Sequence, residues 1–329
     1  MVMWDILVKF IIKNIKALEI LALPATFFLG LYMKFFTRVP PIYLTRSYKW
    51  FTRCNWLPVQ FHYYQPIIKL DMLPENYINI ENELIGVDLD IKSQLNLLGQ
   101  FHYNEELERI PLYKTEGYGP YYDNITFQSG DAEILYNIIR YYKPKKIIEI
   151  GSGESTKFIR SAIAQNKRET QNETEHICIE PFEHPWLEKL DITIIRQRVE
   201  RLDLSLFKEL SQNDILFIDS SHVVRTQGDV VFEYLNIIPS LSKGVIVHCH
   251  DIFLPREYPL IWIDGWKRFW NEQYLLQALL AYSTRYKPLL SLNFLAHHYR
   301  SDLEKCCPIF RRKKEKAREP FSFWFQVMK

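Results

Sequence analysis

Acidic and imidazole side chains follow two apolar runs in the second half of the chain. Asp219 and His222 come directly after the run at 215–218, and His250 and Asp251 come after a later one. A histidine can accept a proton near neutral pH, and carboxylates and imidazoles can both ligate divalent cations. Such groups could activate a weakly acidic hydroxyl in two ways. They could accept its proton as a base, or they could hold a Lewis acid that lowers its pKa.

A repeated alternation of strands and helices is the pattern that would bring these groups together. In α/β sheets, strands that are separated by helices recur at intervals of ~25–35 residues. The apolar runs of this chain lie at 147–150, 176–179, 192–195, 215–218 and 244–247. Ligands in open α/β sheets sit at the carboxyl ends of the strands. We therefore expect the polar residues that follow the runs at 215–218 and 244–247 to lie close together. The predicted fold class is α/β.

A glycine turn after the first run indicates the kind of ligand. The run at 147–150 is β-branched except for Glu149, which predicts a buried parallel strand. Gly151 and Gly153 then let the backbone turn tightly and approach a ligand. A dinucleotide fingerprint would need glycine where Thr156 stands, and no phosphate-loop motif follows. What remains is E-x-G-x-G, and a purely structural turn between strand and helix is the alternative.

The E-x-G-x-G motif resembles the first motif of class I S-adenosylmethionine-dependent methyltransferases. The resemblance implies a Rossmann-like seven-stranded sheet flanked by helices, with S-adenosylmethionine as the cofactor. It also implies that Glu149 handles the amino acid end of the cofactor, while Gly151 and Gly153 pass under its sulfonium and ribose. Ser155, at the end of the same turn, joins this expected cofactor-binding set.

Further polar residues complete the expected cofactor site. Glu180 ends the second run, where a carboxylate can accept both ribose hydroxyls, and Asp219 ends the fourth. The resemblance places the segment before the first strand against the cofactor, with Asn124 and Asp131 as its polar candidates. For Asp131 the alternative is an early-turn charge favoured by the helix dipole.

The acids and histidines at the strand ends resemble a metal-assisted branch of these enzymes, which includes sugar O-methyltransferases and cephalosporin-hydroxylase-like proteins. Members of that branch carry Asp-x-x-His after the fourth strand and an acidic pair after the fifth. The resemblance implies that Asp219 and Asp251 hold a divalent cation and that His222 is the general base for an acceptor hydroxyl. His250 stands where the first acid of the pair would be. The expected ligand set is therefore Asp219, His250 and Asp251, which suits a transition metal better than magnesium.

An ordinary structural interpretation of the same residues stays open. Asp219 and Asp251 can form turns at strand ends, and His222 can cap a helix. His250 can be a hydrogen-bonded polar residue without a catalytic function.

The segment after Asp251 is rich in aromatic residues. Trp262, Trp266 and Trp270 either cover an acceptor or bury a helix that continues to about Tyr282. Farther along, the apolar runs at 288–296 and 321–326 suit the final antiparallel pair of a seven-stranded methyltransferase sheet. The basic run at 311–318 between them is typical of a solvated loop.

Composition fits one catalytic domain with an N-terminal extension. The chain has 329 residues, of which 47% are hydrophobic and 15% aromatic, which argues against disorder. A net charge of +2 gives no sign of nucleic-acid binding. The five cysteines are odd in number and lack zinc-type spacing, which favours a reducing compartment.

The N-terminus departs from this soluble pattern. Residues 6–16 place Lys9, Lys13 and Lys16 on one helical face, as in a helix that lies in a membrane interface. Residues 20–33 carry no charge but fall short of the ~20 residues that span a bilayer. A surface or re-entrant anchor, a single span, a signal peptide and a docked helix are the alternatives. We favour membrane association through residues 1–37, with the catalytic domain in the cytoplasm, at the inner face of the membrane.

These patterns predict three segments: a hydrophobic segment at 1–38, a cap region at 39–120 and the catalytic domain at 121–329. The predicted function is O-methylation of a small-molecule, sugar, glycan or lipid-linked acceptor. A related hydroxylase-like or N-methylating metal enzyme and a non-catalytic S-adenosylmethionine-binding protein are the alternatives. No nucleic-acid partner is expected, and the oligomeric state is left open.

Overall fold

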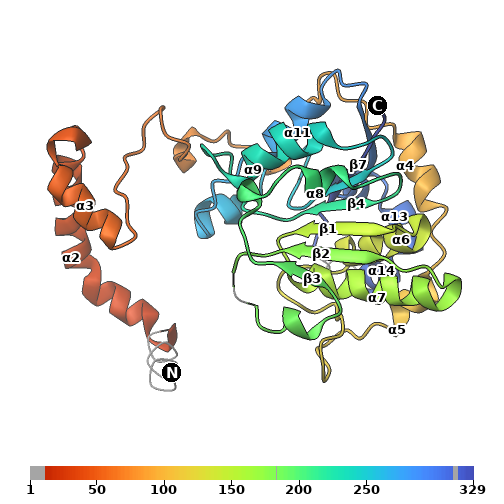
Figure 1. The fold of residues 1–329 in the computed structure, drawn as a ribbon. Helices are drawn as coiled ribbons and strands as arrows, with labels where there is room; N and C mark the ends of the chain where they lie inside the picture. The colour runs from red at the N-terminus through yellow and green to blue at the C-terminus, as the bar shows by residue number, and fades with distance from the viewer. Residues whose placement is uncertain (1–11, 183, 314–317) are drawn as a thin grey trace. The chain divides into compact units, whose positions relative to one another are not determined.

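The chain divides into two compact units, Met1–Leu73 and Pro74–Lys329 (Figure 1). The computed structural model describes residues 12–182, 184–313 and 318–329. The second unit contains the whole sheet and also residues 74–120. This division differs from the predicted boundaries at 38 and 120, because Leu98 and Leu107 belong to the same hydrophobic core as the sheet.

The first unit contains a long helix and a short one. These are α2 (Ile15–Phe36) and α3 (Thr45–Arg53), with single helical turns at Pro41–Tyr43 and Leu70–Met72. The 22 residues of α2 extend over about 33 Å at 1.5 Å per residue, close to the ~30 Å hydrocarbon core of a bilayer. By length and composition α2 qualifies as a membrane span, and its apolar window is not buried within the molecule. Most of the amphipathic stretch predicted at 6–16 lies outside the described residues.

The second unit is built on a seven-stranded sheet with the order β3-β2-β1-β4-β5-β7-β6. The strands are β1 (Lys146–Ile150), β2 (Glu175–Ile179), β3 (Thr193–Ile195), β4 (Ile215–Ile218), β5 (Ile246–Cys249), β6 (Tyr286–Ser291) and β7 (Phe323–Val327). β1 to β5 pair in parallel, whereas β7 runs antiparallel to both β5 and β6. The strand order changes direction at β1, and a ligand crevice forms at such a switch point. This is the seven-stranded methyltransferase sheet that the sequence predicts.

Helices cover both faces of the sheet, as Figure 1 shows. The helices of the second unit are α4 (Ile91–Leu98), α5 (Asn104–Arg109), α6 (Asp131–Tyr142), α7 (Glu154–Thr170), α8 (Ser205–Lys208), α9 (Asp229–Phe232), α10 (Ile238–Ser240), α11 (Glu272–Leu280), α12 (Leu292–His298), α13 (Arg300–Cys306) and α14 (Pro308–Lys313). Consecutive strand residues alternate between two cores. Ile147 and Phe217 pack with α6 and α7, whereas Ile148 and Leu216 pack with α8, α9 and α11. Because both faces are buried, the strands are nearly continuous apolar runs.

Several predicted elements end at different residues in the structure. The chain after β4 stays a loop until α9 begins at Asp229, whose carboxylate accepts hydrogen bonds from the backbone N and Oγ of Ser221 and holds this loop. The run at 288–296 is strand only as far as Ser291, after which α12 begins. The basic run at 311–318 starts inside α14 rather than in a loop, and residues 314–317 lie outside the described part.

Candidate active site

The ends of β1 and β4 approach each other at Gly151. This residue has φ +79°, a left-handed conformation that side chains other than glycine rarely adopt. A Cβ at Gly151 would lie 1.9 Å from the carbonyl oxygen of Asp219. Gly153 differs, because its φ of −164° is extended and a Cβ there would meet open space. Of these two positions, only 151 needs glycine for its backbone conformation.

Two adjoining cavities border this turn and share Gly151, Glu180 and Asp219. The first has a volume of about 330 Å³ and includes Phe182 and Val199 in its wall. The second has a volume of about 420 Å³. Both therefore lie at the carboxyl ends of β1, β2 and β4, where the topology predicts a ligand.

Glu149 lies beneath the glycine turn and is fully buried. Its Oε1 accepts a hydrogen bond from Ser155 Oγ at 2.7 Å, and its Oε2 accepts one from Thr156 Oγ1 at 2.9 Å. His176 Nε2 lies 3.0 Å from the same Oε2. The carboxylate does not line either cavity, so Glu149 supports the turn from below. Direct contact of Glu149 or Ser155 with a cofactor stays a prediction.

Two residues that line the second cavity, Ser152 and Glu154, each have a buried side-chain oxygen without a hydrogen-bond partner within the described residues. These atoms are Ser152 Oγ and Glu154 Oε2. The other oxygen of Glu154 accepts a hydrogen bond from Lys157 Nζ at 2.7 Å, and this ammonium lies 4.5 Å from the ring centroid of Trp186. Unpaired buried polar atoms are rare in native proteins, so these two atoms indicate a polar ligand.

Glu180 and Asn124 both line the second cavity, but differ in how far their polar atoms are used. Glu180 accepts hydrogen bonds from the backbone N of Phe182 at 2.9 Å and of Ser152 at 3.1 Å, which leaves lone pairs for a ligand. Asn124 Oδ1 accepts from Phe127 N at 2.7 Å, and its Nδ2 donates to the carbonyls of Tyr121 and Phe127. Asn124 therefore holds the loop that forms the cavity wall.

Asp131, the other polar candidate before β1, holds the start of β7. Its carboxylate accepts hydrogen bonds from the backbone N of Ser322 at 2.8 Å and of Phe321 at 3.1 Å. Burial raises the pKa of Asp131, against the effect of these bonds. The predicted early-turn position is correct, since Asp131 is the first residue of α6.

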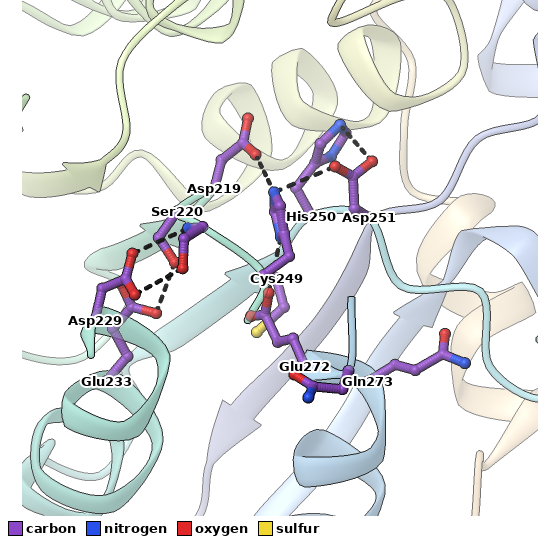
Figure 2. A network of polar contacts seen from close by, with 12 residues as sticks. Asp219, Ser220, Asp229, Glu233, Cys249, His250, Asp251, Glu272 and Gln273 are labelled. Atoms are coloured by element: carbon purple, nitrogen blue, oxygen red, sulfur yellow. Dashed lines mark hydrogen bonds and ion pairs between the residues drawn. The ribbon is translucent and has the colours of Figure 1, made fainter. Parts of the chain in front are cut away.

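A second group of polar side chains converges where β4 and β5 end (Figure 2). Nε2 of His222 lies 3.2 Å from Asp219 Oδ1 and 3.2 Å from Asp251 Oδ2. Its Nδ1 lies 2.8 Å from Oε2 of Glu272, which comes from α11. Tyr234 in turn donates to Oε1 of Glu272 at 2.8 Å. Both nitrogens of His222 are therefore held by carboxylates.

The backbone is strained at two members of this group. His222 has φ 59° and Asp251 has φ 57°, and a left-handed conformation costs a residue other than glycine about 1–2 kcal/mol. The carbonyl of His222 accepts hydrogen bonds from the backbone N of Asn271 and Glu272, at the start of α11. Trp270 covers the imidazole, with ring centroids 4.3 Å apart. Strain of this kind gathers at functional sites.

The charges of these residues depend on one another. Burial by itself lowers the pKa of His222, but the neighbouring carboxylates, chiefly Asp251, outweigh it and raise the pKa well above its ordinary value. Burial by itself raises the pKa of Asp219, but His250 and His222 lower it to about 2. For Asp251 burial prevails and raises the pKa. The carboxylates around His222 therefore favour its protonated form, and the two histidines favour the ionised form of Asp219.

His250 lies beside this group rather than inside it. Its Nδ1 is 3.3 Å from Ser322 Oγ, and its Nε2 is 3.8 Å from Asp251 Oδ1. The ligand atoms that lie within 4.8 Å of one another belong to Asp219, His222 and Asp251. The geometry thus favours His222 over His250 as the imidazole of a metal site, and the predicted ligand role of His250 stays a prediction.

Asp219, His222 and Asp251 fit a divalent cation. Each of them offers one ligand atom, and two carboxylate oxygens with one imidazole nitrogen form a donor set that such cations accept. Glu149, His176 and Cys178 form a second compact group beneath the glycine turn.

Comparison with known proteins assigns the domain. Residues 148–252 match the model of a family described as a methyltransferase domain. The matched segment runs from β1 past the end of β5 and includes the glycine turn, His222 and Asp251. The chain contains a class I methyltransferase domain. Its sheet order and this family match together support S-adenosylmethionine as the cofactor, as the sequence predicts.

The methyltransferase is similar to two further proteins. An uncharacterised protein from Archaeoglobus fulgidus is 29% identical over 189 residues, which cover 50% of this chain and 80% of that protein. A solved structure described as a protein-L-isoaspartate O-methyltransferase from Plasmodium falciparum, in complex with S-adenosyl-L-homocysteine, is 15% identical. The matched region covers 49% of this chain and 77% of that chain, with a TM-score of 0.25.

The methyltransferase site includes residues that sequence reasoning missed. Glu272 lies 50 positions after His222, within the aromatic-rich segment, and Tyr234 lies between the apolar runs at 215–218 and 244–247. No local spacing marks either residue. Glu154 could have been found, because it is a carboxylate inside the glycine turn itself.

Proposed function

We propose that this methyltransferase transfers the methyl group of S-adenosylmethionine to a hydroxyl of a sugar, glycan or lipid-linked acceptor. The observation that carries the proposal is the arrangement of Asp219, His222 and Asp251 beside the two cavities, with Asp219 lining both. A hydroxyl needs a base or a Lewis acid to become a nucleophile, and this group offers residues for both.

The cavities suit the two ends of the cofactor. Glu180 lies at the end of β2, where its free lone pairs can accept the ribose hydroxyls, and Phe182 and Val199 offer apolar surface for the adenine. In the second cavity the unpaired Oε2 of Glu154 can accept the ammonium of the amino acid end, with Ser152 Oγ beside it. This orientation puts the methyl group between the cavities, near Asp219.

In the reaction the acceptor oxygen attacks the methyl carbon while the carbon–sulfur bond breaks, and S-adenosylhomocysteine leaves. The acceptor also loses its proton. Because Nδ1 of His222 is held by Glu272, only Nε2 can receive that proton. Nε2 of His222 is close enough to both carboxylates to be a metal ligand, but its one lone pair cannot bind a metal and receive the proton. We therefore assign the cation to Asp219 and Asp251 and the proton to His222. A cation held there would lower the pKa of a bound hydroxyl and of His222.

Aromatic side chains beside the group support a sugar-like acceptor. Trp270 lies against His222, and its ring packs edge-on against Trp262 at 4.9 Å. Trp262, Phe253 and Phe321 are buried and support Trp270 from behind. Aromatic faces stack on the apolar faces of sugar rings, so the partly exposed ring of Trp270 offers a surface for the acceptor.

We propose in addition that α2 anchors the chain in a membrane, with the methyltransferase domain on the cytoplasmic face. Its length matches a bilayer core, and large apolar side chains project along it, such as Leu21 at 78% exposed and Phe28 at 68%. An anchor of this kind would bring the site to lipid-linked acceptors.

The His222→Ala variant tests the catalytic assignment, with His102→Ala as a control because His102 is exposed and distant in sequence from the site. We expect His222→Ala to abolish methyl transfer while its affinity for S-adenosylmethionine, measured by calorimetry, stays within about threefold of the parent. His102→Ala should keep both properties. Unchanged turnover in His222→Ala would remove His222 from the mechanism.

The acceptor class is tested by methyl-labelled S-adenosylmethionine added to a fractionated cell extract. We expect label in a glycan or glycolipid fraction as an ether that resists mild alkali. Label in N-methyl groups would replace O-methylation with the related enzyme class. An absence of cofactor binding by calorimetry would reject both enzyme classes.

A further inference from the structure

The short helix α3 is fixed to the end of α2 by aromatic packing. Phe36, in the last turn of α2, is 4% exposed. Its ring centroid lies 5.4 Å from that of Tyr48 and 5.4 Å from that of Phe51, both in α3. Trp56 packs edge-on against Phe51 at 5.6 Å. One face of α3 is thereby used to hold the two helices together.

The opposite face of α3 is basic. Arg46, Lys49, Trp50 and Arg53 are spaced three or four residues apart, so they share one side of the helix. All four are exposed, and none of the three cations has an ion pair with another residue of the described chain. We name these four residues the basic face of α3.

The sequence on both sides of α3 is positively charged, like the basic face of α3. Residues 37–70 contain five basic residues and no acidic residue. Exposed aromatic side chains lie on both sides of α3, including Tyr43 at 77% and Tyr63 at 78%. Basic residues with interspersed Trp and Tyr at the end of a membrane span are typical of the headgroup layer of a bilayer.

We propose that α3 lies in the headgroup layer of an anionic bilayer, with its basic face against lipid phosphates, at the end of the α2 span. This inference rests on the proposed membrane anchor. The flank before α2 carries Asp5, Lys9 and Lys13, fewer positive charges than the flank that follows. The excess of Lys and Arg after α2 orients that end toward the cytoplasm, so residues 74–329 continue on the cytoplasmic side.

A label at Cys54 can report on this contact. Cys54 is exposed, directly follows α3, and lies one helical turn after Trp50, whereas the other four cysteines are buried. The full chain is labelled there with an environment-sensitive fluorophore and reconstituted into vesicles of phosphatidylcholine, alone or with phosphatidylglycerol. We expect a blue-shifted emission and protection from an aqueous quencher in the anionic vesicles, both reduced by high salt.

The label at Cys54 should be better protected in anionic vesicles than in neutral ones. The variant R46Q/K49Q/R53Q should reduce this difference at least about tenfold. A matched triple variant, K92Q/K189Q/K243Q, removes three exposed lysines of the second unit and should keep the full difference. Equal protection of the label in neutral and anionic vesicles, or an unchanged difference in the α3 variant, would overturn the inference.

Alkaline carbonate extraction of the same vesicles separates this inference from the proposed anchor. Protein that resists extraction supports the α2 span whatever the label reports. Protein that is extracted, yet shows protection that depends on anionic lipid and on the basic face, rejects the span and supports the contact made by α3.

Discussion

Gly151 and Gly153 in the glycine turn have different structural roles, although only one residue separates them. Gly151 is required by the fold, because its left-handed conformation and its approach to the Asp219 carbonyl both exclude a side chain. Gly153 has an ordinary extended φ and lines the second cavity. A Cβ at Gly153 would meet no protein atom within 4 Å, so its absence leaves room for a ligand.

We predict opposite effects of alanine at these positions. Gly151→Ala should destabilise the domain by more than about 2 kcal/mol, because it adds a backbone clash to the conformational cost. Gly153→Ala should cost less than about 1 kcal/mol but weaken S-adenosylmethionine binding at least tenfold. Urea unfolding and calorimetry measure the two quantities. Equal stability of the two variants would show that the close approach at Gly151 is not maintained in solution.

Glu272 fixes the orientation of His222 without reaching the cavities. It is fully buried, and its two oxygens engage His222 Nδ1 and the hydroxyl of Tyr234. A carboxylate at Nδ1 holds the proton on that nitrogen and, in the proposed mechanism, directs Nε2 toward the reacting group. We therefore classify Glu272 as a positioning residue.

Replacement of this carboxylate by an amide tests that role. Glu272→Gln keeps the size of the side chain but can donate to Nδ1, which favours the wrong tautomer. We expect kcat to fall 10- to 100-fold with KM and cofactor affinity within threefold, and with little change in melting temperature. If KM rises and kcat is retained, Glu272 contributes to binding rather than to the orientation of His222.

At the scale of elements, one buried cation joins three helices beneath the sheet. Arg140 of α6 has a side chain that is 2% exposed, and it donates to Glu106 of α5 at 2.8 and 2.9 Å and to Glu169 of α7 at 2.6 Å. Asn166 accepts another hydrogen bond from it, and the guanidinium lies 4.7 Å from the Tyr103 ring centroid. A buried charge that loses its partner is costly, so the network depends on all its members.

Arg140→Met should lower the free energy of unfolding by about 2–4 kcal/mol, less than for a fully buried pair because Glu169 is partly exposed. The control is Arg109→Met, which removes an exposed ion pair with Glu105 at 3.7 Å. That change should stay within about 0.5 kcal/mol. Chemical denaturation with a constant m-value measures both. Similar effects of the two substitutions would mean that the Arg140 network adds nothing to stability.

The parts of the fold that the sequence predicts well are those with local signals. β1, β2 and β4 are buried on both faces, so apolar runs mark them to within a residue. Asp219, His222 and Asp251 follow from the same logic, because parallel strands end at one edge. Glu272 could not be predicted, since its contact with His222 depends on how a long aromatic loop returns to the sheet.

At the scale of the whole molecule, the proposed catalytic site and the proposed membrane anchor belong to different units. The sheet, both cavities and the residues around His222 belong to Pro74–Lys329, while α2 and α3 belong to Met1–Leu73. The core residues named for the sheet all come from the second unit. The catalytic unit therefore has what it needs to fold without the first 73 residues.

We predict that a chain of residues 74–329 is soluble, unfolds cooperatively and binds S-adenosylmethionine within about twofold of the full chain. It should be lost from the membrane fraction, because both helices that contact lipid in our proposal are removed. Sedimentation of cell extracts and calorimetry test the two parts separately.

The boundary matters, because the predicted cap at 39–120 contains Leu98 and Leu107 of the sheet core, and a chain that starts at 121 should unfold. Stable folding of residues 121–329 alone would restore the predicted cap as a separate region, and membrane retention of residues 74–329 would move the anchor out of the first unit.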